Sequence, residues 1–234
     1  MAKEQIHFDE ASHTYTNERG EILISVSTLI HLYSQPFDPT GEIIKKCAER
    51  RMISVEELQA EWDKERDDAN IRGTSFHSQA EYWVTTGKVK EDGDYKDVVE
   101  QLKLLPFKGK LFSEQIVFSN KLKIAGTIDL TEDLGDNFQR LYDFKTNKQI
   151  KHRGFFNKMT REYSKMLYPV EHLEDCNWNH YCLQLSGYQI LQEESGKAVL
   201  DRTLIYVNPR TRKLEIYDVP DLRKEFYDIL NHYS

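Results

Sequence analysis

Two carboxylates and a lysine near the middle of the chain could bind a metal ion and act on a phosphate. Asp129 falls near the end of one apolar run, and Asp143 and Lys145 lie two apart in a second run. Side chains alternate faces along a strand, so Asp143 and Lys145 should point the same way and Phe144 should enter a core. Carboxylates are hard ligands suited to Mg²⁺ or Mn²⁺. A lysine beside them can stabilise charge on a phosphate or orient a water molecule.

A simpler interpretation of the same residues is a solvated strand face or a cross-strand ion pair, because surface ion pairs carry little information about function. The catalytic interpretation therefore depends on what the rest of the chain places beside these residues.

The elements that would position the two acids form a three-strand meander. The two runs, joined by a turn-rich segment over 131–139, predict a β-hairpin over 124–146. A preceding strand over 111–118 contains Glu114, which could reach the cluster because adjacent strands lie only about 5 Å apart.

The N-terminal part predicts a small hairpin and then helices. A turn at 17–20 is followed by a strand over 21–26 and a short helix capped by Ser25 or Ser27. Residues 42–70 are helical in pattern and highly charged, and Ser54 starts a capping box for the second helix. A further helix, opened at Gly73–Thr74 and closed at Gly87, carries His77 and Glu81 on one face. A histidine in this position is as readily structural as functional.

The residues after the meander predict a nucleic-acid contact and a second layer of helix and strand. The segment 147–175 is long and irregular, and from residue 148 to 165 it holds six bases, one acid and spaced aromatic residues. This composition suits backbone contact and base stacking on single strands, although a basic surface loop is the alternative. A helix over 176–194, strands over 198–207 and 213–219 and a final helix from about 221 complete an α/β fold with a mixed sheet.

Bulk composition favours a single compact core without membrane segments. The 234 residues are 39% apolar, no apolar run reaches membrane-spanning length, and the N-terminus resembles no secretory signal. An odd count of three cysteines favours a reducing, intracellular setting, which we expect to be cytoplasmic. The formal charge is −7, but residues 103–165 hold 13 Lys and Arg against 7 Asp and Glu, a net +6 that leaves −13 elsewhere. The candidate site thus lies in the basic part of the chain.

The motifs, taken in order, resemble the PD-(D/E)XK nuclease superfamily, and within it the RecB-like exonuclease branch. The resemblance rests on Gly73-Thr-Ser-Phe-His77, Glu114, Gly126-Thr-Ile-Asp129, Asp143-Phe-Lys145 and Gln184-Leu-Ser-Gly-Tyr188. It implies a restriction-endonuclease-like α/β core, a central mixed sheet flanked by helices, over 71–234, with residues 1–70 as an N-terminal hairpin and helical region packed on it.

The resemblance also implies a role for each matched residue. His77, Asp129, Asp143 and the backbone carbonyl of Phe144 resemble metal ligands for one or two Mg²⁺ or Mn²⁺ ions. Lys145 resembles the catalytic lysine, and Glu114 the acid that helps to hold the metal. The remaining candidates, which would contact DNA or brace the site, are Glu81, Gln184 and Tyr188 from the motifs and Arg72, Lys148, Lys151 and Arg153 from the basic surroundings.

The chain departs from the family pattern in three places. Ile128 stands where the signature has proline, Asp143 stands where many members have glutamate, and the four-cysteine signature of some relatives is missing, so we expect no iron–sulfur cluster.

The implied activity is a metal-dependent deoxyribonuclease, an exonuclease on DNA ends or single strands in replication, recombination or repair. The relatives include phage-type and mitochondrial single-strand exonucleases, which is compatible with a phage origin. A helicase, recombinase or single-strand-binding protein would be a fitting partner. Two alternatives stay open: a non-catalytic nucleic-acid-binding module on a nuclease scaffold, and a partner-binding protein that acts through its acidic helices.

Overall fold

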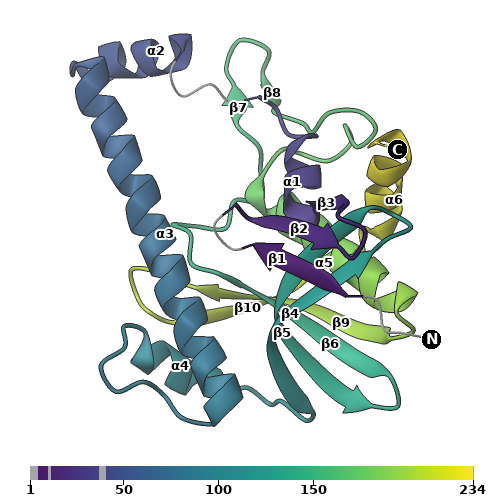
Figure 1. Ribbon diagram of the computed structural model, residues 1–234. Coiled ribbons are helices and arrows are strands. Elements are labelled where there is room, and N and C mark those ends of the chain that lie inside the picture. The colour runs from purple at the N-terminus through teal and green to yellow at the C-terminus, as the bar shows by residue number, and fades with distance from the viewer. Residues whose placement is uncertain (1–4, 10–11, 37–40, 234) are drawn as a thin grey trace.

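The computed structural model of the protein describes residues 5–9, 12–36 and 41–233. It is an α/β protein in which helices flank a central mixed sheet, as the sequence predicts (Figure 1). The strands are β1 (Ile6–Asp9), β2 (Thr14–Asn17), β3 (Ile22–Ser25), β4 (Lys110–Ser119), β5 (Ile124–Gly135), β6 (Phe138–Lys145), β7 (Phe156–Asn157), β8 (Glu162–Tyr163), β9 (Ala198–Val207) and β10 (Leu214–Asp218). The helices are α1 (Val26–His31), α2 (Glu42–Arg51), α3 (Val55–Thr86), α4 (Lys96–Leu102), α5 (Asn177–Glu194) and α6 (Arg223–Tyr233).

The sheet is organised around β5, which changes partner along its length. The described strands run in the order β1-β2-β3-β5-β6-β9-β10, and β4 pairs with the other edge of β5. β3 runs parallel to β5 at Ile124 and Ala125, whereas β6 runs antiparallel to β5 from Leu130 onward. The stretch of β5 between these two pairings contains Asp129. The change of partner therefore opens the sheet at one of the candidate acids.

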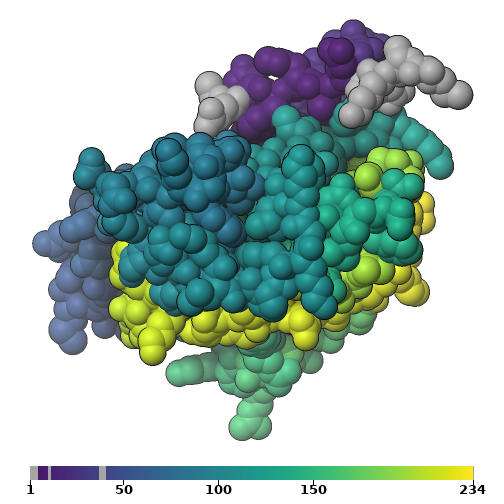
Figure 2. Space-filling model, turned by 90° about the horizontal axis from the view of Figure 1, so that it is seen from below, coloured from purple at the N-terminus to yellow at the C-terminus, as the bar shows by residue number. Residues whose placement is uncertain are grey.

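Two apolar clusters pack on the sheet from helices of different parts of the chain. One joins α3 and α4 to β5, β6 and β9 through residues such as Phe76, Val99 and Phe144. The other joins α1, α5 and α6 to the sheet through residues such as Leu29, Leu183 and Phe226. Seen from below, the blue and teal surface of α3 and α4 forms one face, and the purple N-terminal hairpin lies at its edge (Figure 2).

The helix that carries His77 begins much earlier than Gly73, which corrects the prediction of a separate helix there. α3 runs unbroken from Val55 to Thr86, with the predicted capping box at Ser54 and a left-handed C-cap at Gly87. A glycine inside a helix costs only about 1 kcal/mol relative to alanine, so one glycine does not stop a helix whose ends are well capped. The expected boundary after residue 70 falls inside α3, and β3 belongs to the main sheet. The N-terminal region and the core thus share one helix and one sheet.

The predicted turn over 131–139 is in fact a two-residue turn, because β5 continues to Gly135 and β6 starts at Phe138. Asp136 and Asn137 both have positive φ, which is the conformation of a type I′ hairpin. Polarity misled the prediction, since the polar residues Thr131 and Glu132 are fully buried in the strand.

Glu132 holds the connection between α4 and β4 against the sheet. Its carboxylate accepts the backbone N–H of Lys108 and, at 2.7 Å, that of Gly109, and the Tyr142 hydroxyl donates to it at 2.8 Å. Burial raises the pKa of Glu132, but the donated N–H bonds outweigh it and the net pKa lies below the ordinary value. A buried carboxylate with these donors is a structural anchor.

We expect Glu132→Ala to lower the free energy of unfolding by about 3 kcal/mol, because it leaves two backbone N–H groups and a hydroxyl without their acceptor. Since the pKa of Glu132 is lower in the folded state, its contribution is complete above the unfolded pKa and is lost as the pH falls through the folded pKa. Urea unfolding between pH 3 and 7 measures both effects. Glu194→Ala, at an exposed acid, is the matched control and should change neither.

Candidate active site

Three acids lie in one row across β4, β5 and β6. Ser113 and Gln115 pair with Leu130 and Ile128, which places Glu114 opposite Asp129. Leu130 pairs with Tyr142, and the same register places Asp143 next to Asp129 on the other side. Directly opposite residues in antiparallel strands have Cβ atoms only about 5 Å apart. The meander therefore brings together three carboxylates that are well separated in sequence.

The backbone is irregular at these acids. Glu114 has φ of 49°, which a non-glycine residue seldom adopts, and the recorded pairing of β4 with β5 skips it. Asp129 Oδ2 accepts the backbone N–H of Phe144 at 2.6 Å, just where the β5–β6 pairing stops. A side-chain acceptor has thus replaced a ladder partner, and the strands separate at the site. Such local strain is often found at functional sites.

His77 joins two of the acids from α3. Its Nδ1 lies 3.4 Å from Glu114 Oε1 and 3.7 Å from Asp129 Oδ1, and one ligand atom from each of these residues lies within 4.8 Å of the others. Burial lowers the pKa of His77, but the charges of Asp129 and Glu114 outweigh it and raise the pKa to about 9. One imidazole and two carboxylates are a donor set that fits a divalent cation such as Mn²⁺ or Mg²⁺.

Asp143 and Lys145 form a second part of the site. They point the same way, as the strand alternation predicts, and Lys145 Nζ lies 2.6 Å from Asp143 Oδ2. Phe144 points into the opposite core, where its ring lies 5.1 Å from that of Phe76. Burial raises the pKa of Asp143 to about 6, although the Lys145 ammonium opposes this rise. Asp143 is only 1% exposed, and apart from the Lys145 ammonium at Oδ2 no donor among the described residues reaches its carboxylate.

Asp143 Oδ1, which has no donor among the described residues, is the observation against which a bound ion can be tested. A buried carboxylate oxygen normally accepts a hydrogen bond, so the lack of a donor at Oδ1 needs an explanation. His77, Glu114 and Asp129 place their ligand atoms within 4.8 Å of one another and so fit such an ion, whereas the predicted ligand Asp143 is not among them. The carbonyl of Phe144 stays a predicted ligand, since only its N–H has a recorded contact with the acids.

The predicted Gln184–Tyr188 pair braces the opening in the sheet. Gln184 Nε2 donates to the Tyr188 hydroxyl at 2.9 Å, and the buried Tyr188 ring packs against Gly126. A Cβ on Gly126 would lie 2.5 Å from the Tyr188 ring, so only glycine fits there. The glycine of the Gly-Thr-Ile-Asp motif therefore makes room for the tyrosine of the Gln-x-x-x-Tyr motif.

Tyr181 is a site residue that the sequence analysis missed. Lys145 Nζ lies 4.9 Å from the centre of its ring, within the range of a cation–π contact. Tyr181, Gln184 and Tyr188 are spaced by three and four residues, so they lie along one face of α5. This spacing was the available signal, but it does not show which residue the face meets.

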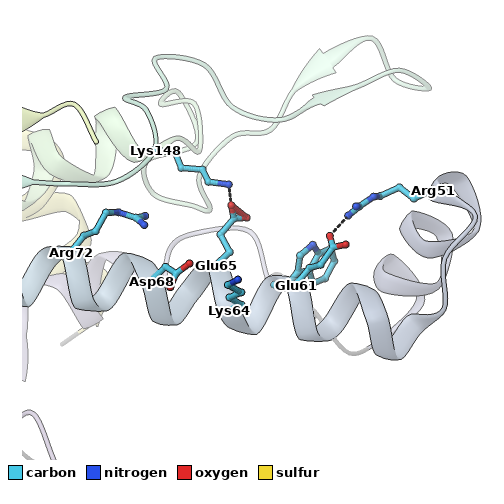
Figure 3. Close-up of a pocket in the computed structure, with 8 residues that line it drawn as sticks. Arg51, Glu61, Lys64, Glu65, Asp68, Arg72 and Lys148 are labelled. Atoms are coloured by element: carbon cyan, nitrogen blue, oxygen red, sulfur yellow. Dashed lines mark hydrogen bonds and ion pairs between the residues drawn. The ribbon is translucent and has the colours of Figure 1, made fainter. Parts of the chain in front are cut away.

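Two of the residues predicted to contact nucleic acid, Lys148 and Arg153, form ion pairs with acidic side chains. Arg72 and Lys148 line a cleft of about 350 Å³ between α3 and the segment after β6, where Lys148 pairs with Glu65 (Figure 3). The Nε of Arg72 has no hydrogen bond among the described residues.

Of the remaining predicted contacts, Arg153 alone has a charged partner within the described ranges. Arg153 pairs with Glu174 at 2.7 Å and lies over the Tyr163 ring. Lys151 is exposed. Glu81 is also exposed, and within the described ranges no hydrogen bond or ion pair connects its carboxylate to the cluster.

Comparisons with known proteins leave the function to be argued from this geometry. No family model matches the sequence, and no curated protein matches it. Among solved structures, the chain is similar to the crystal structure of a "putative exonuclease" from Eubacterium rectale, with 13% identity and a TM-score of 0.41 over 76% of this chain and 73% of that chain. In the part of the chain that the structure describes, no helix is long and apolar enough to cross a membrane.

We expect the site to bind Mn²⁺ and expect either His77→Gln or Asp129→Asn to weaken this binding by more than about tenfold, as loss of a direct ligand should exceed typical losses from its supporting groups. Isothermal titration calorimetry measures the affinity. The matched controls, His7→Gln and Asp218→Asn, change an exposed histidine and an exposed acid and should bind as the wild type does. Equal binding by all four variants would show that the ion does not bind here.

Proposed function

We propose that this protein is a divalent-metal-dependent nuclease of the PD-(D/E)XK type that hydrolyses phosphodiester bonds in DNA. The observation that carries the proposal is the row of Glu114, Asp129 and Asp143 across three strands, with His77 and Lys145 at its two sides. A simple surface ion pair would not be buried at an opening of the sheet, and it would not leave Asp143 Oδ1 without a donor among the described residues.

Each side chain has a role in this proposal. His77, Glu114 and Asp129 would hold the ion, and Asp143 and the Phe144 carbonyl would complete its ligands. A bound Mg²⁺ or Mn²⁺ would supply positive charge to stabilise the phosphoryl oxygens and the leaving group. The ammonium of Lys145 is held by Asp143 on one side and by the Tyr181 ring on the other. It would orient the attacking water or stabilise the charge that develops on the phosphate.

Basic residues beside the site support a nucleic-acid substrate. Arg72 lines the cleft next to α3, and its buried Nε has no hydrogen bond among the described residues. Lys148 and Arg153 are paired with partly exposed acids. Phosphates of a bound strand could replace these acids, because exposed ion pairs are weak. We further propose that the enzyme is an exonuclease on DNA ends or single strands, serving replication, recombination or repair inside the cell, together with a helicase, recombinase or single-strand-binding protein.

We expect Asp143→Asn and Lys145→Ala each to lower the cleavage rate by about a hundredfold or more while the fold is kept, because each removes charge aimed at the reacting phosphate. The measurement is cleavage of end-labelled linear and closed circular DNA, single- and double-stranded, with Mg²⁺ or Mn²⁺ and with EDTA. Circular dichroism reports the fold. Asp218→Asn and Lys213→Ala, at exposed positions, should cleave at the wild-type rate.

The substrate set separates the alternatives. Cleavage of linear but not circular DNA identifies an exonuclease. Metal-dependent cleavage that survives both site substitutions contradicts the assigned residues. DNA binding without cleavage by the wild type identifies a non-catalytic binding module instead of a nuclease.

A further inference from the structure

A pocket of about 130 Å³ lies between α1 and α5, which pack against each other beside the sheet (Figure 1). α1 contributes Ser27, Ile30 and His31 to its lining, and α5 contributes Asn177, His180, Tyr181 and Gln184. None of the roles described above uses the side chains from α1.

The pocket shares a wall with the candidate active site. Tyr181 lines the pocket and also lies against the Lys145 ammonium, 4.9 Å from its ring centre. Gln184, another lining residue, bonds the Tyr188 hydroxyl that braces the sheet opening. The Tyr181 ring is therefore shared by the pocket and by the contact with Lys145.

The chemistry of the lining favours a planar, uncharged ring over a phosphate. Among the described residues that line the pocket, none is a lysine, arginine, aspartate or glutamate. The Nε2 of His180 already contacts the Asp175 carboxylate at 2.7 Å, which makes this edge unsuitable for a second anion. The walls are instead an aromatic ring, an aliphatic side chain, two imidazoles with centroids 5.7 Å apart, a hydroxyl and two amides. These groups stack on a ring and offer hydrogen bonds at its edge.

Size and hydrogen bonding agree with this chemistry. A cavity of about 150 Å³ accommodates one benzene ring, so this pocket holds one six-membered ring and not a complete nucleotide. His31 Nδ1 lies 2.7 Å from the Ser27 carbonyl, to which it must donate. That bond fixes the His31 ring and leaves its Nε2 without a recorded partner among the described residues.

We propose that this pocket binds one unpaired pyrimidine base of the DNA strand, next to the phosphate that is cleaved. The proposal rests on the nuclease function above and defines its substrate class. A base that is paired and stacked in a duplex cannot enter a pocket, so the strand must be single or frayed at this nucleotide. The pocket would also fix the position of the strand relative to Lys145 through Tyr181.

The test combines changes in the protein with changes in the DNA. A single abasic residue is moved through a single-stranded oligonucleotide, and cleavage by the wild type is measured at each position. We expect one position, adjacent to the cleaved bond, at which the missing base lowers kcat/KM by about tenfold, as expected for loss of one stacked base.

In Ser27→Phe, which fills the pocket, and in His31→Ala, which removes an exposed wall, the normal strand should already be impaired and the abasic residue should cause no further loss. Asn231→Phe adds the same ring at an exposed site on α6 and should behave as the wild type does.

The outcomes separate this inference from the proposed function. If DNA is cleaved but no position is sensitive, or if the sensitivity persists unchanged in both pocket variants, the inference is wrong and the nuclease function stands. If no DNA is cleaved, the nuclease function fails. Fluorescence anisotropy of the same oligonucleotides in EDTA then tests the pocket alone: a base-dependent difference in binding that disappears in His31→Ala supports it, and its absence overturns it.

Discussion

The hydrogen bond from the Phe144 N–H to the Asp129 carboxylate determines how the centre of this fold is built. A backbone donor that would otherwise bind the neighbouring strand is satisfied by a side chain, so β5 and β6 can separate without leaving a buried N–H unpaired. The resulting opening is occupied by Tyr188, for which Gly126 leaves space. The polar site is thus part of the sheet architecture and could not be added to a regular sheet by exchanging surface residues.

Positively charged neighbours stabilise this arrangement of carboxylates. Three carboxylates in one row would repel one another, but two cations are placed among them. The charges of Asp129 and Glu114 raise the pKa of His77, which lies between these two acids, and Lys145 pairs with Asp143. The two cations are held differently: one is an imidazole that can give up its proton to become a ligand, and the other is an ammonium that keeps its charge.

Sequence reasoning was most successful where a local rule acts alone. The alternation of Asp143, Phe144 and Lys145 and the capping box at Ser54 both follow from the geometry of one element, and the structure confirms them. It failed where tertiary contacts determine whether a residue is buried and what it binds. Glu132 is polar, so the sequence analysis placed it in a turn. It is in fact buried in β5, because its hydrogen-bond donors come from a loop that is distant in sequence. The opening between β3 and β6 and the contact of Tyr181 with Lys145 depend on tertiary packing, which no local pattern encodes.

The continuity of α3 has a mechanical consequence. The same helix holds His77 against the acids and, more than twenty residues earlier, the charged end that packs on α2. At 1.5 Å per residue, about 33 Å of rigid rod separates Val55 from His77, so a rotation of one degree about the core moves the far end by about 0.6 Å. Conversely, a molecule that binds the N-terminal end of α3 and tilts the helix would also move the His77 imidazole. A single helix, α3, therefore connects the site on the sheet with the end of the molecule that packs on α2.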